Sequence, residues 1–360
     1  MFRLSTKAIK NVTFSLLWIT FLCTSTWAAE DKKPNIVILA TGGTIAGVGN
    51  TSANVSAYQS AVVPVDSLIS AVPELQNIAN IKGEQVLQIG SESYNNERWL
   101  KLGKRVSELL KSDSVDGVVI THGTDTIEET GYFLNLTIKS EKPVVLVGSM
   151  RPGSAMSADG PLNIYNAVIV ASSPSSIGKG ALVVMNDEIH SARDVTKTNS
   201  VKVETFRSLY GPLGTVTEGK PRYYRLPARP HTLQSEFDID SIGTLPEVGV
   251  VLAHGNMSRV PYDAFVASGV KAIIHVGTGS GSIADYLAPV LKEIRSKGVL
   301  IIRASRTGSG IVVRNGEAND DELDYVVTDD QNAGKARILL TLALTKTSDT
   351  KALQEIFWKY

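Results

Sequence analysis

Residues 35–47 read NIVILATGGTIAG and divide into an apolar run, 35–40, and a loop rich in threonine and glycine, 41–47. The run is too short for a helix and rich in β-branched residues, which predicts a buried strand. In the same way, the run DGVVI at 116–120 leads into the loop THGTDT at 121–126. Both loops therefore begin where a strand ends, and ligands bind at that edge of open α/β sheets.

The glycines of the first loop exclude two common nucleotide sites. Gly42, Gly43 and Gly47 miss the Gly-x-Gly-x-x-Gly spacing of a dinucleotide-binding turn, and the chain has no Gly-x-x-x-x-Gly-Lys-Ser/Thr phosphate loop. Two interpretations remain for this loop. The Gly42-Gly43 pair makes a tight turn that requires positive φ, or the loop is part of a chemical site.

A third motif favours the chemical site. The strand-like run ALVVMND at 181–187 is followed by RDVTKTN at 193–199, which contains Lys197. Taken alone, Lys197 is an ordinary surface lysine. Beside a threonine it becomes a candidate base, because a threonine hydroxyl is a poor nucleophile until its proton is removed, and desolvation or neighbouring cations lower the pKa of a lysine.

Together these motifs resemble the bacterial type II L-asparaginases, and among them the periplasmic glutaminase-asparaginases. The resemblance covers essentially everything after residue 30, with several separate motifs in the same order. The matching stretches are ILATGGTIAG at 38–47, ITHGTDT at 120–126, MSADG at 156–160, RDVTKT at 193–198 and EIFWKY at 355–360.

The resemblance implies hydrolysis of the side-chain amides of L-glutamine and L-asparagine, with release of ammonia. Thr44 is then the candidate nucleophile with Tyr58 as its proton partner, while Thr124, Lys197 and Asp125 form a Thr-Lys-Asp relay. Which threonine attacks, and whether a covalent ester forms, stays open. Tyr58 lies in the uncharged segment 47–61, which is either a poorly packed surface loop or a mobile lid over the substrate.

The same resemblance implies a set of substrate-binding residues. Ser91 and Glu92 match a turn that binds the α-carboxylate, and Thr124 and Asp125 also meet the substrate, Asp125 through its ammonium group. Glutamate at position 92 is typical of the glutaminase-asparaginase branch, where stricter asparaginases carry glutamine. Without the resemblance, Ser91 would be an ordinary loop serine.

Two further positions imply an oligomer. Asn256 and Glu317 match residues that, in this family, reach the site of a neighbouring subunit, which implies a homotetramer with shared sites. Taken alone, both are ordinary turn residues. His254 departs from the aromatic residue that the family commonly has two positions before this asparagine, so the contribution of the second domain is less well defined.

Composition separates the first 28 residues from the rest of the 360-residue chain. Arg3, Lys7 and Lys10 precede a mostly apolar run, and small residues end at Ala28. This pattern is typical of a secretory signal peptide and is too short to span a membrane. It predicts a periplasmic protein whose only cysteine, Cys23, is removed, which excludes disulfides and a cysteine nucleophile.

Charge argues against nucleic-acid and membrane-surface partners. Without the three basic residues of the predicted signal peptide, 33 Lys and Arg stand against 36 Asp and Glu, a net charge of −3. The five histidines show no His-Glu-x-x-His pattern or helical ligand spacing, so we expect no metal and no organic cofactor.

Alternating strand and helix patterns predict an α/β protein. We expect a large N-terminal domain with a mainly parallel, helix-covered sheet and a smaller C-terminal α/β domain. The predicted divisions are a signal peptide at 1–28, an N-terminal catalytic domain at 29–226, a proline-punctuated linker at 227–246 and a C-terminal domain at 247–360. Predicted helices include 65–71, 95–111, 128–138, 261–267, 283–296 and 333–345, and further predicted strands include 142–148, 248–253, 272–276 and 299–304.

Two competing functions fit parts of this description. A strict L-asparaginase would share the catalytic residues but have little activity on glutamine. A non-catalytic periplasmic amino-acid-binding protein would also be exported, free of cysteine and built from two α/β domains. The threonine pair with Lys197 favours an enzyme, because a protein that only binds its ligand needs no proton relay.

Overall fold

The computed structural model of the protein describes residues 32–360. The predicted signal peptide and Cys23 lie outside these residues. Strand β1 (Asn35–Gly42) contains the strand predicted at 35–40 and lies second from one edge of an eight-stranded sheet. Five neighbouring strands of the sheet run parallel, as predicted. In spatial order they are β4 (Asn80–Ile89), β1, β5 (Gly117–Thr121), β6 (Val144–Val147) and β7 (Ala181–Met185).

The other three strands of this sheet are antiparallel and were not predicted. Asn186 and Asp187, with φ of 50° and 64°, form the two-residue turn of a hairpin between β7 and β8. Asparagine and aspartate tolerate positive φ, which such turns require. The strands are β8 (Glu188–Ser191), β11 (Gly214–Thr217) and β12 (Lys220–Tyr223), and a separate hairpin pairs β9 (Val195–Lys197) with β10 (Phe206–Ser208).

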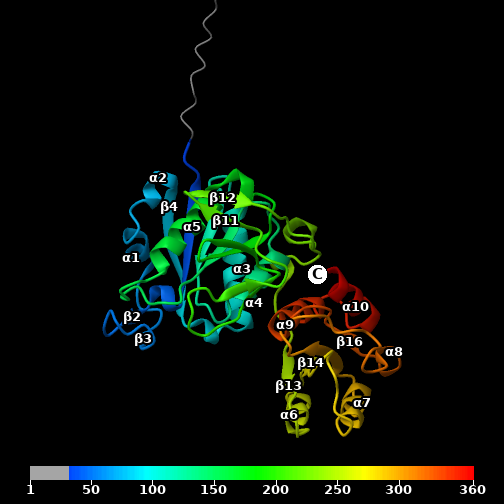
Figure 1. Cartoon of the computed structure of the whole chain (residues 1–360). Helices are drawn as coiled ribbons and strands as arrows, with labels where there is room; N and C mark the ends of the chain where they lie inside the picture. Colours follow the sequence, from blue (N-terminus) through cyan, green and yellow to red (C-terminus); the bar gives the residue numbers. More distant parts are fainter. Residues whose placement is uncertain (1–31) are drawn as a thin grey trace, which may run out of the picture. The chain divides into compact units, whose positions relative to one another are not determined.

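Helices cover both faces of the large sheet (Figure 1). Successive side chains of a strand point to opposite faces. Accordingly, Val37 and Leu39 pack in a core with α3 (Asn96–Lys111) and α4 (Ile127–Thr137). Ile36 and Ile38 pack in a second core on the other face. The helices of that second core are α1 (Val65–Ser70), α2 (Leu75–Ile78) and α5 (Gly160–Ser172). The predictions of α1, α3 and α4 are confirmed to within one residue at each end.

A smaller sheet of four parallel strands follows; three of them were predicted, and the two-residue β16 was not. It comprises β13 (Val248–Leu252), β14 (Ala272–Gly277), β15 (Leu300–Ser305) and β16 (Val326–Val327). Its helices are α6 (Val260–Ser268), α7 (Ala288–Ser296), the short α8 (Asp320–Leu323), α9 (Ala333–Ala343) and α10 (Thr350–Lys359). Helix α7 starts five residues later than predicted, with a proline in its first turn, where proline is favoured.

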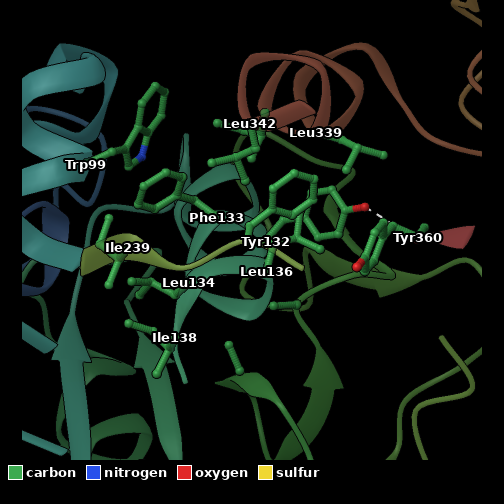
Figure 2. Packing of buried hydrophobic residues seen from close by; sticks show 14 of the residues in the cluster. Trp99, Tyr132, Phe133, Leu134, Leu136, Ile138, Ile239, Leu339, Leu342 and Tyr360 are labelled. Atoms are coloured by element: carbon green, nitrogen blue, oxygen red, sulfur yellow. Dashed lines mark hydrogen bonds between the residues drawn. The ribbon is translucent and has the colours of Figure 1, made fainter. Parts of the chain in front are cut away.

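Helices α4 and α9 bring the two sheets into one continuous core. Figure 2 shows Tyr132 and Phe133 of α4 beside Leu339 and Leu342 of α9, with the Tyr132 hydroxyl donating to the main-chain oxygen of Tyr360. In the connection between β12 and β13, Phe237 and Ile239 are fully buried in this core. The stretch 227–246 is therefore packed in part, and the predicted domain boundaries stay a prediction.

None of the helices in residues 32–360 combines the length and the apolar character needed to cross a membrane.

Candidate active site

Three neighbouring strands deliver their following loops to one cavity. Strands β4, β1 and β5 are adjacent and parallel, so Ser91, Thr44 and Thr124 reach the same edge of the sheet. The next two strands of this sheet along the chain, β4 and β5, lie on opposite sides of β1. Open α/β sheets bind ligands at such a point. The cavity holds about 290 Å³ and is lined by Gly43, Thr44, Ser56, Tyr58, Ser60, Gly90, Ser91, Glu92, Gly123, Thr124 and Asp125.

The two threonine loops touch through their main chains. Gly43 has a φ of 81°, and a Cβ atom there would overlap the main-chain atoms of Gly123. A Cβ atom at Gly123 would lie 2.6 Å from Ser91 Oγ. The tight turn predicted for this loop is present, and the same glycine brings the two loops together at the cavity. Glycine provides the positive φ and also the close approach.

Thr44 and Tyr58 form the first hydrogen-bonded pair of the cavity. Thr44 opens the 3-10 turn η1 (Thr44–Ala46), and its Oγ1 lies 2.7 Å from the Tyr58 hydroxyl oxygen. Tyr58 belongs to β3 (Tyr58–Gln59), which pairs with β2 (Val48–Gly49) in a small hairpin. Thr44 is buried, whereas Tyr58 is 36% exposed. A phenol at this distance can take up or return the threonine proton.

Thr124, Lys197 and Asp125 form the second group. Lys197 Nζ donates to Thr124 Oγ1 at 2.8 Å and to Asp125 Oδ1 at 2.6 Å. The lysine side chain is only 17% exposed, while that of Asp125 is 59% exposed. Lys197 is therefore not a free surface lysine. A proton can pass between its amine and the threonine hydroxyl along a single hydrogen bond.

Ser91 joins the loop after β4 to the loop after β5. Its Oγ accepts from the main-chain N–H of Asp125 at 3.1 Å, and its carbonyl oxygen accepts from Thr126 Oγ1 at 2.7 Å. Ser91 is buried, whereas the neighbouring Glu92 is exposed and lines the cavity. These contacts place Ser91 and Asp125 side by side in the lining of the cavity.

His122 lies behind the second loop in one defined tautomer. The carbonyl oxygen of Gly123 can only accept, so His122 Nδ1 donates to it at 2.6 Å. Trp99 Nε1 donates to Thr130 Oγ1, whose hydroxyl then donates to His122 Nε2 at 2.9 Å. Burial lowers the pKa of His122 to about 4, so the ring is neutral at pH 7. These contacts give His122 a structural place beside the second threonine loop.

The loop 153–156 contacts the segment that contains Tyr58 and holds it in place. The main-chain N–H of Gly49 donates to Ser154 Oγ at 2.7 Å. Two main-chain hydrogen bonds add to this contact, from Gly153 N–H to the Gly47 oxygen and from Met156 N–H to the Ser52 oxygen. Most of segment 47–61 is otherwise exposed. Residues 153–156 therefore fix the position from which Tyr58 reaches Thr44.

The structure brings together all the predicted site residues except two. Asn256 and Glu317 are exposed on loops near the second sheet and are outside the lining of this cavity. Conversely, Ser56 and Ser60 line the cavity but were not singled out from the sequence. Their only signal was membership of the serine-rich segment around Tyr58. Within residues 32–360, no three His, Cys, Asp or Glu side chains cluster in a way that could hold a metal ion.

Comparison with known proteins places these loops in a family. The family model described as "Asparaginase, N-terminal" matches residues 35–229, and "Glutaminase/Asparaginase C-terminal domain" matches residues 247–357. The chain belongs to the asparaginase family. Both threonine loops and Lys197 fall within the first of these matches.

Similar members of the asparaginase family extend over nearly the whole chain. A glutaminase-asparaginase of Pseudomonas fluorescens biotype A is 57% identical over 92% of this chain and 92% of its own. A probable periplasmic L-asparaginase of Haemophilus influenzae is 49% identical over 90% and 92%. The crystal structure of a probable cytoplasmic L-asparaginase from Campylobacter jejuni is 44% identical, covers 91% of this chain and all of that one, and has a TM-score of 0.89.

Proposed function

We propose that this protein hydrolyses the side-chain amides of L-glutamine and L-asparagine, giving glutamate or aspartate and ammonia. The observation that carries the proposal is the contact of Lys197 Nζ with Thr124 Oγ1, in a cavity that also holds the Thr44–Tyr58 pair. Two activated hydroxyls suit a reaction with two steps. The names of similar proteins, glutaminase-asparaginase among them, support the same chemistry.

The amino acid binds with its charged end between Ser91 and Asp125. The exposed Asp125 carboxylate receives the α-ammonium group, and the turn at Ser91 and Glu92 receives the α-carboxylate. The side-chain amide then extends toward the two threonines. Glutamine is longer than asparagine by one methylene, a difference worth only about 1–3 kcal/mol in a pocket, so both substrates fit this scheme.

The reaction follows from the two hydrogen-bonded groups. The Thr44 oxygen bonds to the amide carbon while its proton passes to the Tyr58 oxygen, and the Tyr58 hydroxyl gives its own proton to the amide nitrogen. The C–N bond then breaks, and the protonated nitrogen leaves as ammonia. The oxygen of a water molecule bonds to the ester carbon while the Thr124–Lys197–Asp125 relay takes one water proton; the bond to the Thr44 oxygen breaks, and that oxygen takes up a proton, which regenerates the hydroxyl.

An ammonia-release assay with both amides tests the function. We expect turnover of both, with values of kcat/KM for asparagine and glutamine within about a hundred-fold of each other. A larger ratio in favour of asparagine would assign the protein to the strict asparaginases. Tight binding of either amino acid without ammonia release would instead make it a binding protein and refute the proposal.

We also propose that the protein is exported to the periplasm after removal of residues 1–28, with residues 29–226 as its catalytic domain and 247–360 as its C-terminal domain. The basic start and apolar run of the N-terminus support export. The H. influenzae relative is named a probable periplasmic enzyme and the C. jejuni relative a probable cytoplasmic one. Sequencing the N-terminus of the mature protein tests this part.

The active form that we propose is a homotetramer whose sites are shared between subunits. Glu317 lies on an exposed loop whose main chain is hydrogen-bonded to buried side chains. Arg303 and Asp320 form a fully buried ion pair, Arg303 donates to the Val313 oxygen, and Asp320 accepts from the main-chain N–H of Asn315. A rigid loop presenting an exposed carboxylate suits delivery of Glu317 to another subunit.

Mixing two inactive variants should restore activity if sites are shared. We expect Thr44→Ala and Glu317→Ala chains each to be impaired alone and to regain part of the wild-type ammonia release after subunit exchange, because one mixed site then carries both native residues. A mixture of Thr44→Ala with Thr124→Val, two residues of the same chain's cavity, is the matched control and should stay inactive. A fully active monomer in light scattering at assay concentration would contradict the shared site.

A further inference from the structure

The strand that carries Lys197 has a partner strand on only one edge. Strand β9 pairs with β10 in a two-stranded sheet, and β9 has no other strand beside it in residues 32–360. On its second edge, the N–H of Lys197 and the carbonyl of Val195 point the same way, because alternate residues of a strand direct their main-chain groups to the same side. Unpaired groups at this position would leave Lys197 loosely placed.

Side chains from two helices take the place of the missing strand. The Lys197 N–H donates to Glu128 Oε2 at 2.8 Å, and the Val195 carbonyl accepts from Lys335 Nζ. Between them, Asn332 Nδ2 donates both to Glu128 Oε1 and to Thr196 Oγ1, each at 3.0 Å. Each residue of β9 therefore has a side-chain partner. Lys197 binds Glu128 of α4, Thr196 binds Asn332, which caps α9, and Val195 binds Lys335 of α9.

Glu128 connects the two halves of the relay directly. It lies in the first turn of α4, and the loop leading into α4 carries Thr124 and Asp125. The same carboxylate therefore fixes the main chain of Lys197 relative to Thr124 Oγ1 and Asp125 Oδ1, the two atoms that Lys197 Nζ contacts. Asn332 in turn holds the carboxylate, and its Oδ1 accepts from the Lys335 N–H at the start of α9.

Lys335 adds charge balance to this arrangement. Its side chain is almost fully buried, and burial lowers its pKa to about 8, while the negative charge of Glu128 opposes that decrease. A buried ammonium group and a nearby carboxylate stabilise one another only while both are present. Glu128, Asn332 and Lys335 thus form one connected group, in which Glu128 accepts hydrogen bonds and the side chains of Asn332 and Lys335 donate them.

We propose that Glu128, Asn332 and Lys335, here called the β9 clasp, are positioning residues that set the place of Lys197 relative to Thr124 and Asp125. The C-terminal part of the chain, through Asn332 and Lys335, thereby takes part in the reaction without touching substrate. The inference rests on the proposed function in so far as Lys197 is the relay base.

An exchange of donor and acceptor tests the β9 clasp. Glu128→Gln turns an amide N–H₂ group toward the Asn332 amide, which also donates. Asn332→Asp keeps the helix cap, since aspartate caps as well as asparagine, but it places two carboxylates together. In the double variant, the amide introduced at position 128 donates to the carboxylate introduced at position 332. The oxygen of that amide still accepts from the Lys197 N–H, and the total charge is unchanged.

We expect each single variant to lose about ten- to a hundred-fold in kcat for glutamine, because a misplacement of about 1 Å can cost a hundred-fold. KM should change little, and the double variant should recover most of the loss. Glu129→Gln is the control: its carboxylate binds Arg337 of α9 at 2.8 Å and does not contact β9. That variant should keep the wild-type kcat.

Hydrogen exchange of the Lys197 amide provides a measure that does not depend on activity. It should become faster in both single variants and slow again in the double variant, with thermal unfolding confirming that all four proteins are folded. Single variants that keep kcat within two-fold of an active wild type, or a folded double variant without recovery, would overturn the β9 clasp and leave the proposed function standing. A wild-type protein that releases no ammonia, with the exchange pattern intact, would overturn the function instead.

Discussion

Thr44→Ala and Thr124→Val should each lower kcat by about a thousand-fold or more, as loss of a catalytic group usually does. In the proposed mechanism, Thr44→Ala removes the oxygen that bonds to the amide carbon, and Thr124→Val removes the hydroxyl that contacts Lys197 Nζ. Steady-state ammonia release measures both. The two variants differ in a further respect, because the proposed ester can form in Thr124→Val but not in Thr44→Ala.

Mass spectrometry of each variant mixed with glutamine separates the two roles. An acyl adduct should accumulate on Thr124→Val and be absent from Thr44→Ala, and the reverse pattern would make Thr124 the nucleophile. Thr51→Ala is the control, because Thr51 is exposed in the Tyr58 segment and lies outside the cavity lining. It should stay within two-fold of wild type. Near-normal turnover in a folded Thr44→Ala or Thr124→Val chain would remove that residue from the mechanism.

Lys197→Met should reduce kcat by about a thousand-fold or more while a non-hydrolysable substrate analogue still binds within about ten-fold of wild type. Removing a proton relay weakens the transition state much more than it weakens ground-state binding. Turnover and calorimetric titration of the analogue measure the two effects. Lys202→Met provides the control, since Lys202 is an exposed lysine five residues further along the chain. An intact kcat in Lys197→Met would reduce Lys197 to an ion-pair partner of Asp125.

Sequence patterns predicted most of the parallel strands but not β16, which has only two residues. Buried parallel strands are continuous apolar runs, so β1 and β5 stood out, and the rule that ligands lie beyond their carboxyl ends placed Thr44 and Thr124 together. Strands β8 to β12 were not predicted, because each has only three or four residues and so shows no clear pattern. Helix α5 escaped because most of its residues are buried, which leaves little periodic contrast between its faces.

Some features of the site depend on tertiary packing and could not be predicted. Glu128 and Asn332 are 204 residues apart, and their contact exists only because α9 packs against α4. No local pattern indicates that a glutamate in a first helical turn will accept from the main chain of Lys197. The resemblance covered the loops that hold the reacting groups, whereas the supporting contacts became visible only in three dimensions.

The main-chain contact between Gly43 and Gly123 limits how this site can be redesigned. A side chain at Gly43 would force apart the loops that hold the two threonines, and one at Gly123 would overlap Ser91, so libraries that randomise these glycines would consist mostly of inactive members. Substrate preference is better altered at Ser56, Ser60 and Glu92, which line the cavity with side chains that larger or smaller groups can replace. Variation is therefore possible at side chains of the cavity lining, whereas the two glycines leave no room for a side chain.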